Sequence, residues 1–266
     1  MISRLPGLSL PEMLWRTARR WALAWWRILY LGAVVLVLVL SPSSYGRGTR
    51  GALARHIYLD TAPVLVGFTA LAALLSLVLT RIVVVTALSY GLSRYALEMV
   101  IRVLVLELIP LTAALFVAMR CTIPNGTQVA RLRQSGSLEA LRRRGADPVR
   151  VELLPRVIAG VFACVTLAAL SCVVALVMAY LGVFGFNLAG LPGYTRMFGQ
   201  VFTPSVTLLF ALKTLFFSLA VALIPMAAGL HGDEGRTIEG SELGGLARMF
   251  AVLLLIEVGS LMGNYY

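Results

Sequence analysis

The sequence is poor in charged residues and contains almost no lysine. Charged residues occupy 13% of the 266 positions, whereas hydrophobic residues occupy 59%. Soluble domains carry about 25% charged residues, so this composition excludes an ordinary soluble protein and indicates one embedded in a membrane. Among the 23 basic residues, Lys213 is the one lysine, and it lies inside an apolar run. The glycine-rich GxxxxGK[ST] sequence that binds nucleotide phosphates therefore does not occur, and ATP hydrolysis by this chain alone is excluded.

Cysteine and histidine are also scarce. Cys121, Cys164 and Cys172 form no even set, so they predict buried small side chains and no disulfide framework. His56 and His231 lie far apart, with no cysteine or carboxylate at a metal-ligand spacing. We expect the chain to bind no metal ion, to hold no cofactor and to be no enzyme.

Long apolar runs dominate the rest of the chain. A helix needs about 20 apolar residues to cross the hydrocarbon core of a bilayer. The pattern therefore predicts an all-α, polytopic bundle of transmembrane helices, in a membrane of the bacterial inner-membrane type. The candidate spans cover residues 22–41, 61–90, 97–119, 153–182, 205–230 and 246–263.

The distribution of arginine predicts how these spans are oriented. Residues 120–152 hold seven arginines and three acidic residues, which places this loop in the cytoplasm by the positive-inside rule. Alternation then places residues 91–96 and 183–204 in the periplasm and 231–245 in the cytoplasm. Orientation explains the net charge of +11, so we expect no binding of nucleic acid.

The first apolar segment does not fit this rule. Alternation places the arginines between 47 and 55 in the cytoplasm, so a spanning helix over 22–41 would send the earlier arginines outside. We therefore expect about five spans, preceded by a segment that lies in the membrane interface or enters and returns. Pro11–Arg20 is amphipathic, and Trp25 and Trp26 suit the headgroup level. Six ordinary spans stay an alternative, because the rule is a bias.

The cytoplasmic loop carries signals for ordered structure. Ser137–Arg144 predicts a helix with arginines in its last turn, and Gly145 predicts its end. Asp147 is suited to cap a new helix, with Pro148 at the first helical position. The alternative is a solvated basic loop that only holds the orientation of the spans.

A set of short motifs follows without a gap between Glu107 and Arg156. Glu107-Leu108-Ile109-Pro110 is similar to E-L-G-P, Ala113–Arg120 to A-L-L-x-A-G-R, and Glu139-Ala140-Leu141 to a D-A-L motif. Gly145–Arg150 is close to G-V-D-P-V-R, and Leu154–Val157 to V-P-R-x. In this order the motifs resemble the MlaE/YrbE family, the membrane permeases of ABC transporters that work with MCE proteins in lipid traffic. Weaker likeness reaches Leu212-Lys213-Thr214 and Ile256-Glu257.

The resemblance implies a permease without its own nucleotide site, built from residues 51–266 and preceded by an interfacial segment over 1–50. Its implied partners are an ABC ATPase that binds ATP and magnesium, a periplasmic MCE protein, and a second permease protomer that is identical or different. Its implied substrate is a lipid, most simply a phospholipid. The implied contact with the ATPase lies in the loop 120–152, at Gln128, Arg131, Arg133, Glu139, Leu141, Arg142, Arg143, Arg144 and Asp147.

Departures from the family pattern lie in the same loop. Thr122-Ile123 stands where the family has Gly-Ser, Gln128 replaces an acidic residue, and Gly136-Ser137 replaces Glu-Gln. The family segment is acidic, whereas residues 131–144 are strongly basic. We therefore expect a divergent branch, or one half of a heteromeric pair, with an altered surface toward the ATPase.

Charged residues inside the apolar runs are the other candidate site. Each costs about 2.5 kcal/mol or more at the bilayer centre, so each needs a reason. The simplest reason is structural ion pairing between spans, such as Glu107 with Lys213 or Arg102 with Glu257. Arg81 lies where the resemblance implies a lipid cavity, and a guanidinium suits a lipid phosphate. The intramembrane candidates are Arg81, Arg102, Glu107, Pro110, Lys213 and Glu257.

Two of these features support further expectations. Pro110 should kink its helix and free backbone groups. The glycines at 182, 185 and 190 predict a periplasmic turn region that faces the MCE partner. Two other functions stay open: an ion-coupled secondary transporter that uses Glu107, Glu257 and Lys213 as a relay, or a membrane scaffold that transports nothing.

Overall fold

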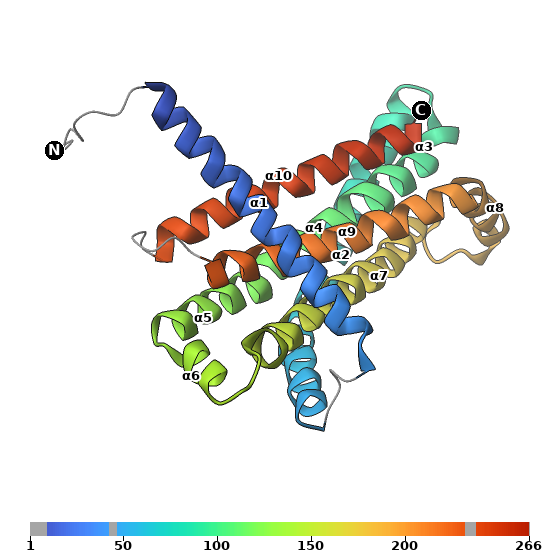
Figure 1. Ribbon diagram of the computed structural model, residues 1–266. Coiled ribbons are helices and arrows are strands. Elements are labelled where there is room, and N and C mark those ends of the chain that lie inside the picture. The colour runs from blue at the N-terminus through green and yellow to red at the C-terminus, as the bar shows by residue number, and fades with distance from the viewer. Residues whose placement is uncertain (1–9, 43–46, 232–237, 266) are drawn as a thin grey trace.

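The computed structural model describes residues 10–42, 47–231 and 238–265, and this part of the chain is almost entirely helical, with no strand. Six helical stretches within it are long and apolar enough to cross a membrane, so the chain is a multi-pass membrane protein. Each predicted apolar run falls in one of them, which confirms the all-α bundle (Figure 1). The stretches are Trp21–Leu40, Arg50–Ser89, Tyr95–Gln134, Val149–Phe184, Pro204–His231 and Leu243–Asn264.

The first helix, α1, runs without a break from Leu10 to Leu40 and crosses the bundle at a steep slant (Figure 1). A segment that enters the membrane and returns is therefore wrong. The physical reason is local, because the run from Trp21 to Leu40 contains a single glycine and no proline to turn the chain. Positive-inside statistics concern orientation and say nothing about helix continuity.

One face of α1 packs across neighbouring helix ends. Leu31 and Val35 are buried against Val157 of α7 (Leu154–Phe184) and Met226 of α9 (Pro204–His231). The guanidinium of Arg27 donates to the carbonyl of His231 at 3.2 Å. These contacts lie in the first turns of α7 and the last turns of α9, at the end of the bundle that was predicted to be cytoplasmic. This placement suits an interfacial helix, and whether α1 spans the membrane stays a prediction.

The second and third spans are longer than a bilayer is thick. α2 runs from Arg47 to Ser89, and the third span continues through α3 (Ser93–Val100), η2 (Ile101–Leu108), α4 (Ile109–Val117), η3 (Ala118–Thr122) and α5 (Ile123–Gln134). The 40 residues of Tyr95–Gln134 extend about 60 Å as a helix, against a hydrocarbon core of about 30 Å. The end of this span therefore projects out of the membrane and carries α5 with it.

Three turns of π-helix interrupt the α-helices, and each ends two residues before a proline. η2 ends before Pro110, η3 before Pro124, and η4 (Val149–Leu153) before Pro155. Proline has no N–H, and its ring clashes with the carbonyl four residues earlier, so the wider π turn relieves the conflict. A proline alone does not produce a π turn, because Pro63 in α2 and Pro225 in α9 lie inside unbroken α-helix.

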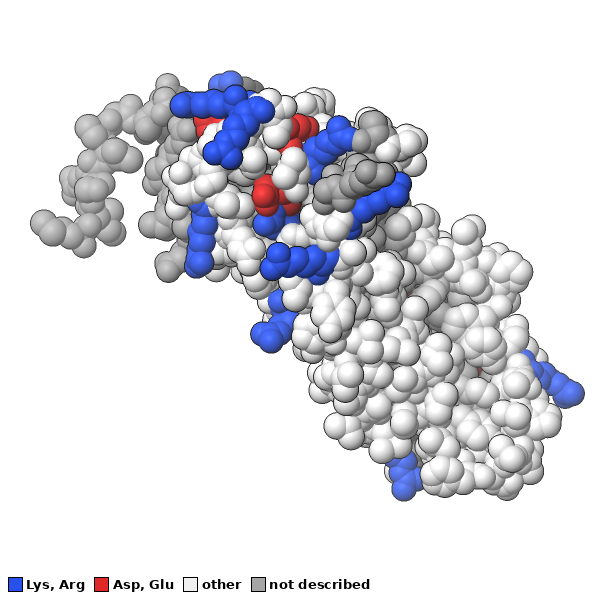
Figure 2. Space-filling model, turned by 90° about the horizontal axis from the view of Figure 1, so that it is seen from below, with Lys and Arg blue, Asp and Glu red and all other residues white. Residues whose placement is uncertain are grey.

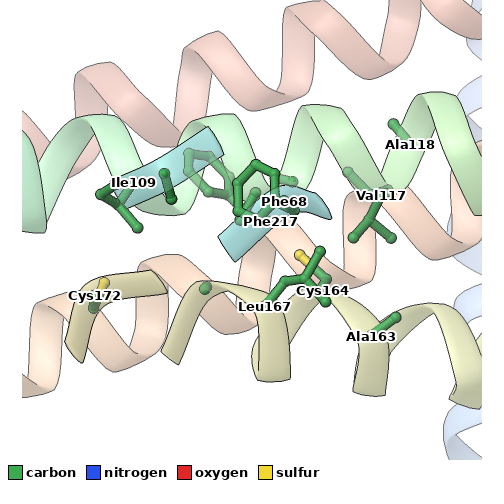
Figure 3. Packing of buried hydrophobic residues seen from close by; sticks show 14 of the residues in the cluster. Phe68, Ile109, Val117, Ala118, Ala163, Cys164, Leu167, Cys172 and Phe217 are labelled. Carbon is green, nitrogen blue, oxygen red and sulfur yellow. The ribbon is translucent and has the colours of Figure 1, made fainter. Parts of the chain in front are cut away.

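The core lies where α2, α4, α7 and α9 meet. Phe68, Val117, Leu167 and Phe217 are buried together there (Figure 3). Many of their neighbours on α7 are alanine or cysteine, and such small side chains let membrane helices approach closely. The three cysteines are free and buried, as their positions in apolar runs predicted.

The two ends of the bundle differ in charge. After α5, the chain forms the short helix α6 (Ser137–Arg143) and returns through η4 into α7. We call the end that carries α5 and α6 the basic end. Figure 2 shows basic side chains gathered at one end of the molecule, while most of the remaining surface in view is uncharged. The opposite end carries η5 (Leu188–Gly190) and α8 (Leu191–Val201), and α10 runs from Ile238 to Tyr265.

Candidate functional site

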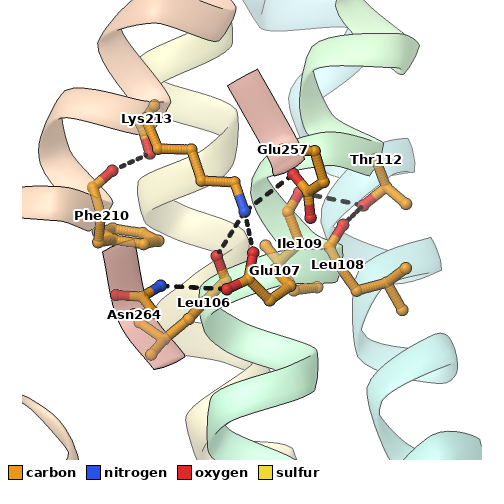
Figure 4. A network of polar contacts seen from close by, with 10 residues as sticks. Leu106, Glu107, Leu108, Ile109, Thr112, Phe210, Lys213, Glu257 and Asn264 are labelled. Atoms are coloured by element: carbon orange, nitrogen blue, oxygen red, sulfur yellow. Dashed lines mark hydrogen bonds and ion pairs between the residues drawn. The ribbon is translucent and has the colours of Figure 1, made fainter. Parts of the chain in front are cut away.

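Three intramembrane charges from three helices meet at one point. Lys213 of α9 lies between Glu107 of η2 and Glu257 of α10 (Figure 4). The Lys213 ammonium bonds directly to the Glu107 carboxylate, and its Nζ lies 2.9 Å from Oε2 of Glu257. Lys213 is 2% exposed and Glu107 8% exposed, so the charges compensate one another away from water. The predicted pair of Glu107 with Lys213 is confirmed, and Glu257 joins it.

A backbone group completes the surroundings of this ammonium. Lys213 Nζ donates to the carbonyl oxygen of Leu106 at 3.3 Å. In a regular helix that oxygen would accept from the residue four positions later, which is Pro110 and has no N–H. Pro110 was predicted to free a backbone acceptor, and Lys213 is the donor that bonds to it. Lys213 thus donates to the Glu107 carboxylate and to this carbonyl, and it forms an ion pair with Glu257.

Further contacts hold the trio in place. Asn264 on α10 donates from Nδ2 to Glu107 Oε1 at 3.2 Å, and the Lys213 Nζ lies 5.6 Å from the ring centroid of Phe217. The distance to Phe217 is within the range of a cation–π contact. α10 thus supplies two side chains to the cluster, Glu257 and Asn264. We call Glu107, Lys213, Glu257 and Asn264 the ion cluster.

Glu107, Lys213 and Glu257 lie inside candidate membrane spans, whereas Asn264 is the last residue of its span. The thiol of Cys172 on α7 approaches the carbonyl of Val105 at 3.6 Å, two residues before Glu107. On α7 the 28 residues from Val157 to Phe184 carry no charge, and Cys172 lies close to their midpoint. An unpaired charge inside an apolar span is costly, which explains why the three charged side chains converge.

Arg102 and Arg81 do not join the ion cluster. Arg102 Nε lies 3.0 Å from Glu98 Oε1, one turn earlier on the same helix, so the predicted pair with Glu257 is wrong. The i,i+4 spacing to Glu98 offered a nearer partner, and Lys213 already occupies Glu257. Arg81 is exposed on α2 and directly follows 20 uncharged residues that begin at Thr61. The residues that follow Arg81 are also apolar, so Arg81 lies inside the candidate span Arg50–Ser89, and its contact with a lipid phosphate stays a prediction.

The loop at the basic end has the ordered structure that its sequence predicted. Gly136, with φ of +73°, separates α5 from α6, and Gly145, with φ of +76°, follows α6. The N–H of Gly145 donates to Arg142 O, and the N–H of Ala146 donates to Leu141 O. This pair of hydrogen bonds is the Schellman motif that ends a helix. Asp147 Oδ1 then accepts from Val149 N at 3.0 Å and caps the next helix.

The loop presents basic side chains to the surroundings. Gln128, Arg131, Arg142, Arg143 and Arg144 are exposed, as are Glu139 and Asp147. Leu138 is buried and anchors α6, and Leu141 is half-buried. Arg133 is half-buried and donates to the carbonyl of Leu230 at 3.3 Å, which ties α5 to the end of α9. The residues predicted to meet an ATPase thus form one accessible surface, and their role stays a prediction.

A second polar cluster was not among the predicted sites. Asn125 Nδ2 donates to Asp60 Oδ2 at 3.0 Å, and the Cys121 thiol approaches the Asp60 carbonyl at 3.1 Å. Nearby, Arg156 of α7 donates to Glu152 at 2.5 Å. One signal could have found it, because Asp60 directly precedes the 20 uncharged residues of α2 and is therefore the last charge before the membrane core.

The opposite end of the bundle holds a tightly built turn. Gly185 has φ of +61° after α7, and the Tyr180 hydroxyl donates to Asn187 O at 2.5 Å. The Tyr194 hydroxyl of α8 donates to Leu176 O at 2.9 Å, and burial raises the pKa of Tyr194 to about 12. Phe186 at the tip is 94% exposed. The predicted turn region is therefore present, and its contact with a partner stays a prediction.

Comparison with known proteins places this architecture in a broader context. A family model described as Permease MlaE matches residues 53–261, about four-fifths of the chain. The match includes every residue of the ion cluster except Asn264, and the whole loop at the basic end. A search of curated proteins found no match.

Proposed function

Because the chain belongs to the MlaE permease family, we propose that it is the membrane subunit of an ABC transporter that moves lipid with energy from a separate ATPase. The matched region spans α2 to α10 and includes the loop at the basic end. The sequence lacks a GxxxxGK[ST] loop, so ATP and magnesium would be held by the partner chain. A permease of this kind needs a surface that receives the ATPase and a polar site inside the membrane.

The surface at the basic end carries this proposal. α6 lies between two glycines in left-handed conformations, so its position relative to α5 and α7 is defined by the backbone. Arg142, Arg143 and Arg144 project from it and are exposed. Three adjacent guanidinium groups favour an acidic partner surface by charge complementarity. We expect the ATPase of this transporter to be acidic where it contacts α6.

The ion cluster supplies the polar site inside the membrane. A lipid headgroup that crosses the core needs polar partners there, because hydrocarbon offers none. Glu257 is half-buried, whereas Lys213 is fully enclosed, so Glu257 is the acidic group nearest to an approaching headgroup. The many exposed leucine and valine side chains of α1, α2 and α10 would face acyl chains or a second protomer.

The remaining assignments follow the same family. We place the protein in a bacterial inner membrane, with the basic end in the cytoplasm and α8 in the periplasm. The turn around Phe186 would face an MCE partner, and a second protomer would complete the lipid cavity. The substrate that fits a cluster of charges between apolar walls is a phospholipid.

The test starts from the complex in detergent-solubilised membranes of the native host. Affinity purification of the tagged chain should recover an ATPase subunit, and the reconstituted complex should move a fluorescent phospholipid when Mg-ATP is added. Reversal of Arg142, Arg143 and Arg144 to glutamate should abolish both recovery of the ATPase and lipid movement. Retention of full transport by this triple variant, together with recovery of no ATPase by the wild type, would refute the proposal. Leu243→Ala, at an exposed apolar position on α10, is a control.

One observation favours a second candidate, an ion-coupled transporter. The ion cluster combines one basic group with two carboxylates, and an excess carboxylate is a means of binding a proton inside a membrane. A proton gradient across ATP-free vesicles would then drive transport. Transport under those conditions would support this candidate against the ATPase-driven one.

A further inference from the structure

The first turn of α5 lies between two other helices. On one side, Asn125 is 6% exposed and bonds through Nδ2 to Asp60 Oδ2 of α2 at 3.0 Å. One turn earlier, the Cys121 thiol lies 3.1 Å from the Asp60 carbonyl oxygen. Asp60 therefore contacts this helix through both its side chain and its backbone. These contacts join segments that are 65 residues apart in the sequence.

On the other side, α5 meets α9 backbone to backbone. A Cβ on Gly126 would lie 2.7 Å from the carbonyl oxygen of Pro225, and a Cβ on Gly229 would meet the carbonyl oxygen of Gly126. Only glycine permits such an approach. Farther along α5, the Arg133 guanidinium donates to the Leu230 carbonyl of α9 at 3.3 Å, so this side of α5 is held by close packing and by a directional bond. The bond from Asn125 to Asp60 is a directional contact from the first turn of α5 to α2.

Charges on α2 and α7 surround the same point. The imidazole of His56 and the guanidinium of Arg156 lie near the Asp60 carboxylate, and Arg156 is itself bonded to Glu152. Arg156 is buried, so this group lies inside the junction of α2, α5 and α7. Asp60 thus occupies the point where the helix that leads to the basic end meets two membrane-spanning helices.

From this arrangement we propose that Asp60 and Asn125 form the joint that transmits movement of α5 and α6 to α2. Asp60 is a positioning residue, since it acts through Asn125 and touches no substrate. α5 is a single helix from Ile123 to Gln134, so a displacement at α6 reaches Asn125 without loss in a flexible loop. This inference rests on the proposed function, because an ATPase at α6 is the source of the movement.

Exchanging the Asp60 and Asn125 side chains tests the hydrogen bond between them while the shape of the site stays nearly the same. Asn125→Asp alone places two carboxylates against each other and removes the donor. The double variant Asp60→Asn with Asn125→Asp restores one amide and one carboxylate with their roles exchanged. Asp60→Asn alone keeps an acceptor oxygen and is the conservative variant. Ser135→Ala, which removes a hydroxyl that bonds to Leu132 and Ser137 within the loop, is the matched control.

Two measurements are made on each variant. Hydrogen–deuterium exchange of residues 123–143 in the detergent-solubilised permease, without ATPase, reports how firmly α5 and α6 are held. The reconstituted complex with its ATPase reports fluorescent phospholipid moved per ATP hydrolysed. We expect Asn125→Asp to raise exchange in this segment and to lower the ratio about tenfold, because the donor is lost and two carboxylates then face each other. The swap, the conservative variant and Ser135→Ala should stay within about twofold of the wild type.

A merely structural role predicts a different result. Loss of folded protein would lower ATP hydrolysis and lipid movement in parallel and would leave their ratio unchanged. The proposed joint would therefore be refuted if ATP hydrolysis and lipid movement fell in parallel in Asn125→Asp. It would also be refuted if the double variant did not restore the ratio of lipid moved to ATP hydrolysed. If the wild type moves no lipid upon ATP addition, the proposed function fails. The exchange measurement then still decides whether Asp60 holds α5, and unchanged exchange in Asn125→Asp refutes that contact.

Discussion

Lys213 Nζ donates to the carbonyl oxygen of Leu106 at 3.3 Å, and that oxygen is the acceptor which Pro110 leaves without an N–H. The single lysine of the chain therefore donates to a backbone carbonyl that a proline in another helix leaves without its usual donor. A lysine is suited to this place because its ammonium donates to the backbone oxygen and to the Glu107 carboxylate while its charge compensates Glu257. The π turn of η2 and the ion cluster are thus two aspects of one local structure.

Replacement of Lys213 by methionine should destabilise the protein strongly. The change keeps an unbranched side chain of similar length and leaves Glu107 and Glu257 without their cation. Breaking a buried ion pair costs about 3–5 kcal/mol, so the unfolding transition in detergent should fall markedly. Arg102→Gln is the control, because its partly exposed pair with Glu98 should contribute less than about 1 kcal/mol. Equal effects of the two variants would contradict a special role for the ion cluster.

Pro110→Ala should impair transport more than stability. The new N–H would compete with Lys213 for Leu106 O and would favour a regular α-turn in place of η2. We expect the free energy of unfolding to change by less than about 1 kcal/mol, while lipid movement falls severalfold. Pro63→Ala, at an exposed proline inside α2, is the matched control and should leave transport unchanged. Transport by Pro110→Ala at the wild-type rate would show that the freed carbonyl is dispensable.

Gly229→Ala tests the contact between α5 and α9. Its Cβ would meet the backbone of Gly126, which is part of a helix and cannot move aside as a side chain can. Overpacking of this kind costs about 1–3 kcal/mol. Gly67→Ala on α2 meets nothing within 4 Å and should be neutral or stabilising by up to about 1 kcal/mol. Unfolding measured by loss of helical signal in detergent compares the two, and a neutral Gly229→Ala would contradict the close approach.

We expect ionisation of Tyr194 to lower the stability of the folded protein at alkaline pH. Burial raises its pKa from 10 to about 12, so the folded state holds the phenolic proton more tightly than the unfolded state does. The contribution to stability is complete below pH 10 and is lost as the pH rises toward 12. Tyr194→Phe should remove this part of the alkaline decline, whereas Tyr90→Phe, at an exposed ring, should keep it. Thermal unfolding at pH 9 and pH 11 measures the difference, and identical declines in both variants would contradict the assignment.

The sequence predicts local features well and contacts between distant helices less well. Gly145 and Asp147 act on residues next to them, so the end of α6 and the start of the following helix could be read directly. The pair of Glu107 with Lys213 was predictable because charges deep in a membrane need partners and the chain holds few. The partner of Arg102 was wrong because the choice between Glu98 and Glu257 depends on which helices are neighbours.

Two other features show where sequence reasoning stops. Asp60 and Asn125 lie at the ends of apolar runs, where polar residues are common, and nothing local links them across 65 positions. The course of α1 was misjudged in part because a charge rule was applied to helix continuity. An apolar run without proline folds as one helix whatever its orientation, and its contacts with α7 and α9 then decide where it lies.

We propose that this permease moves lipid with energy supplied by a separate ATPase. The most direct test is transfer of a fluorescent phospholipid by the reconstituted permease, with and without its copurified ATPase subunit, in the presence of Mg-ATP. The account predicts transfer only when the ATPase and hydrolysable ATP are both present, and loss of that transfer in Lys213→Met. Equal transfer without the ATPase, or transfer driven by a proton gradient alone, would contradict it.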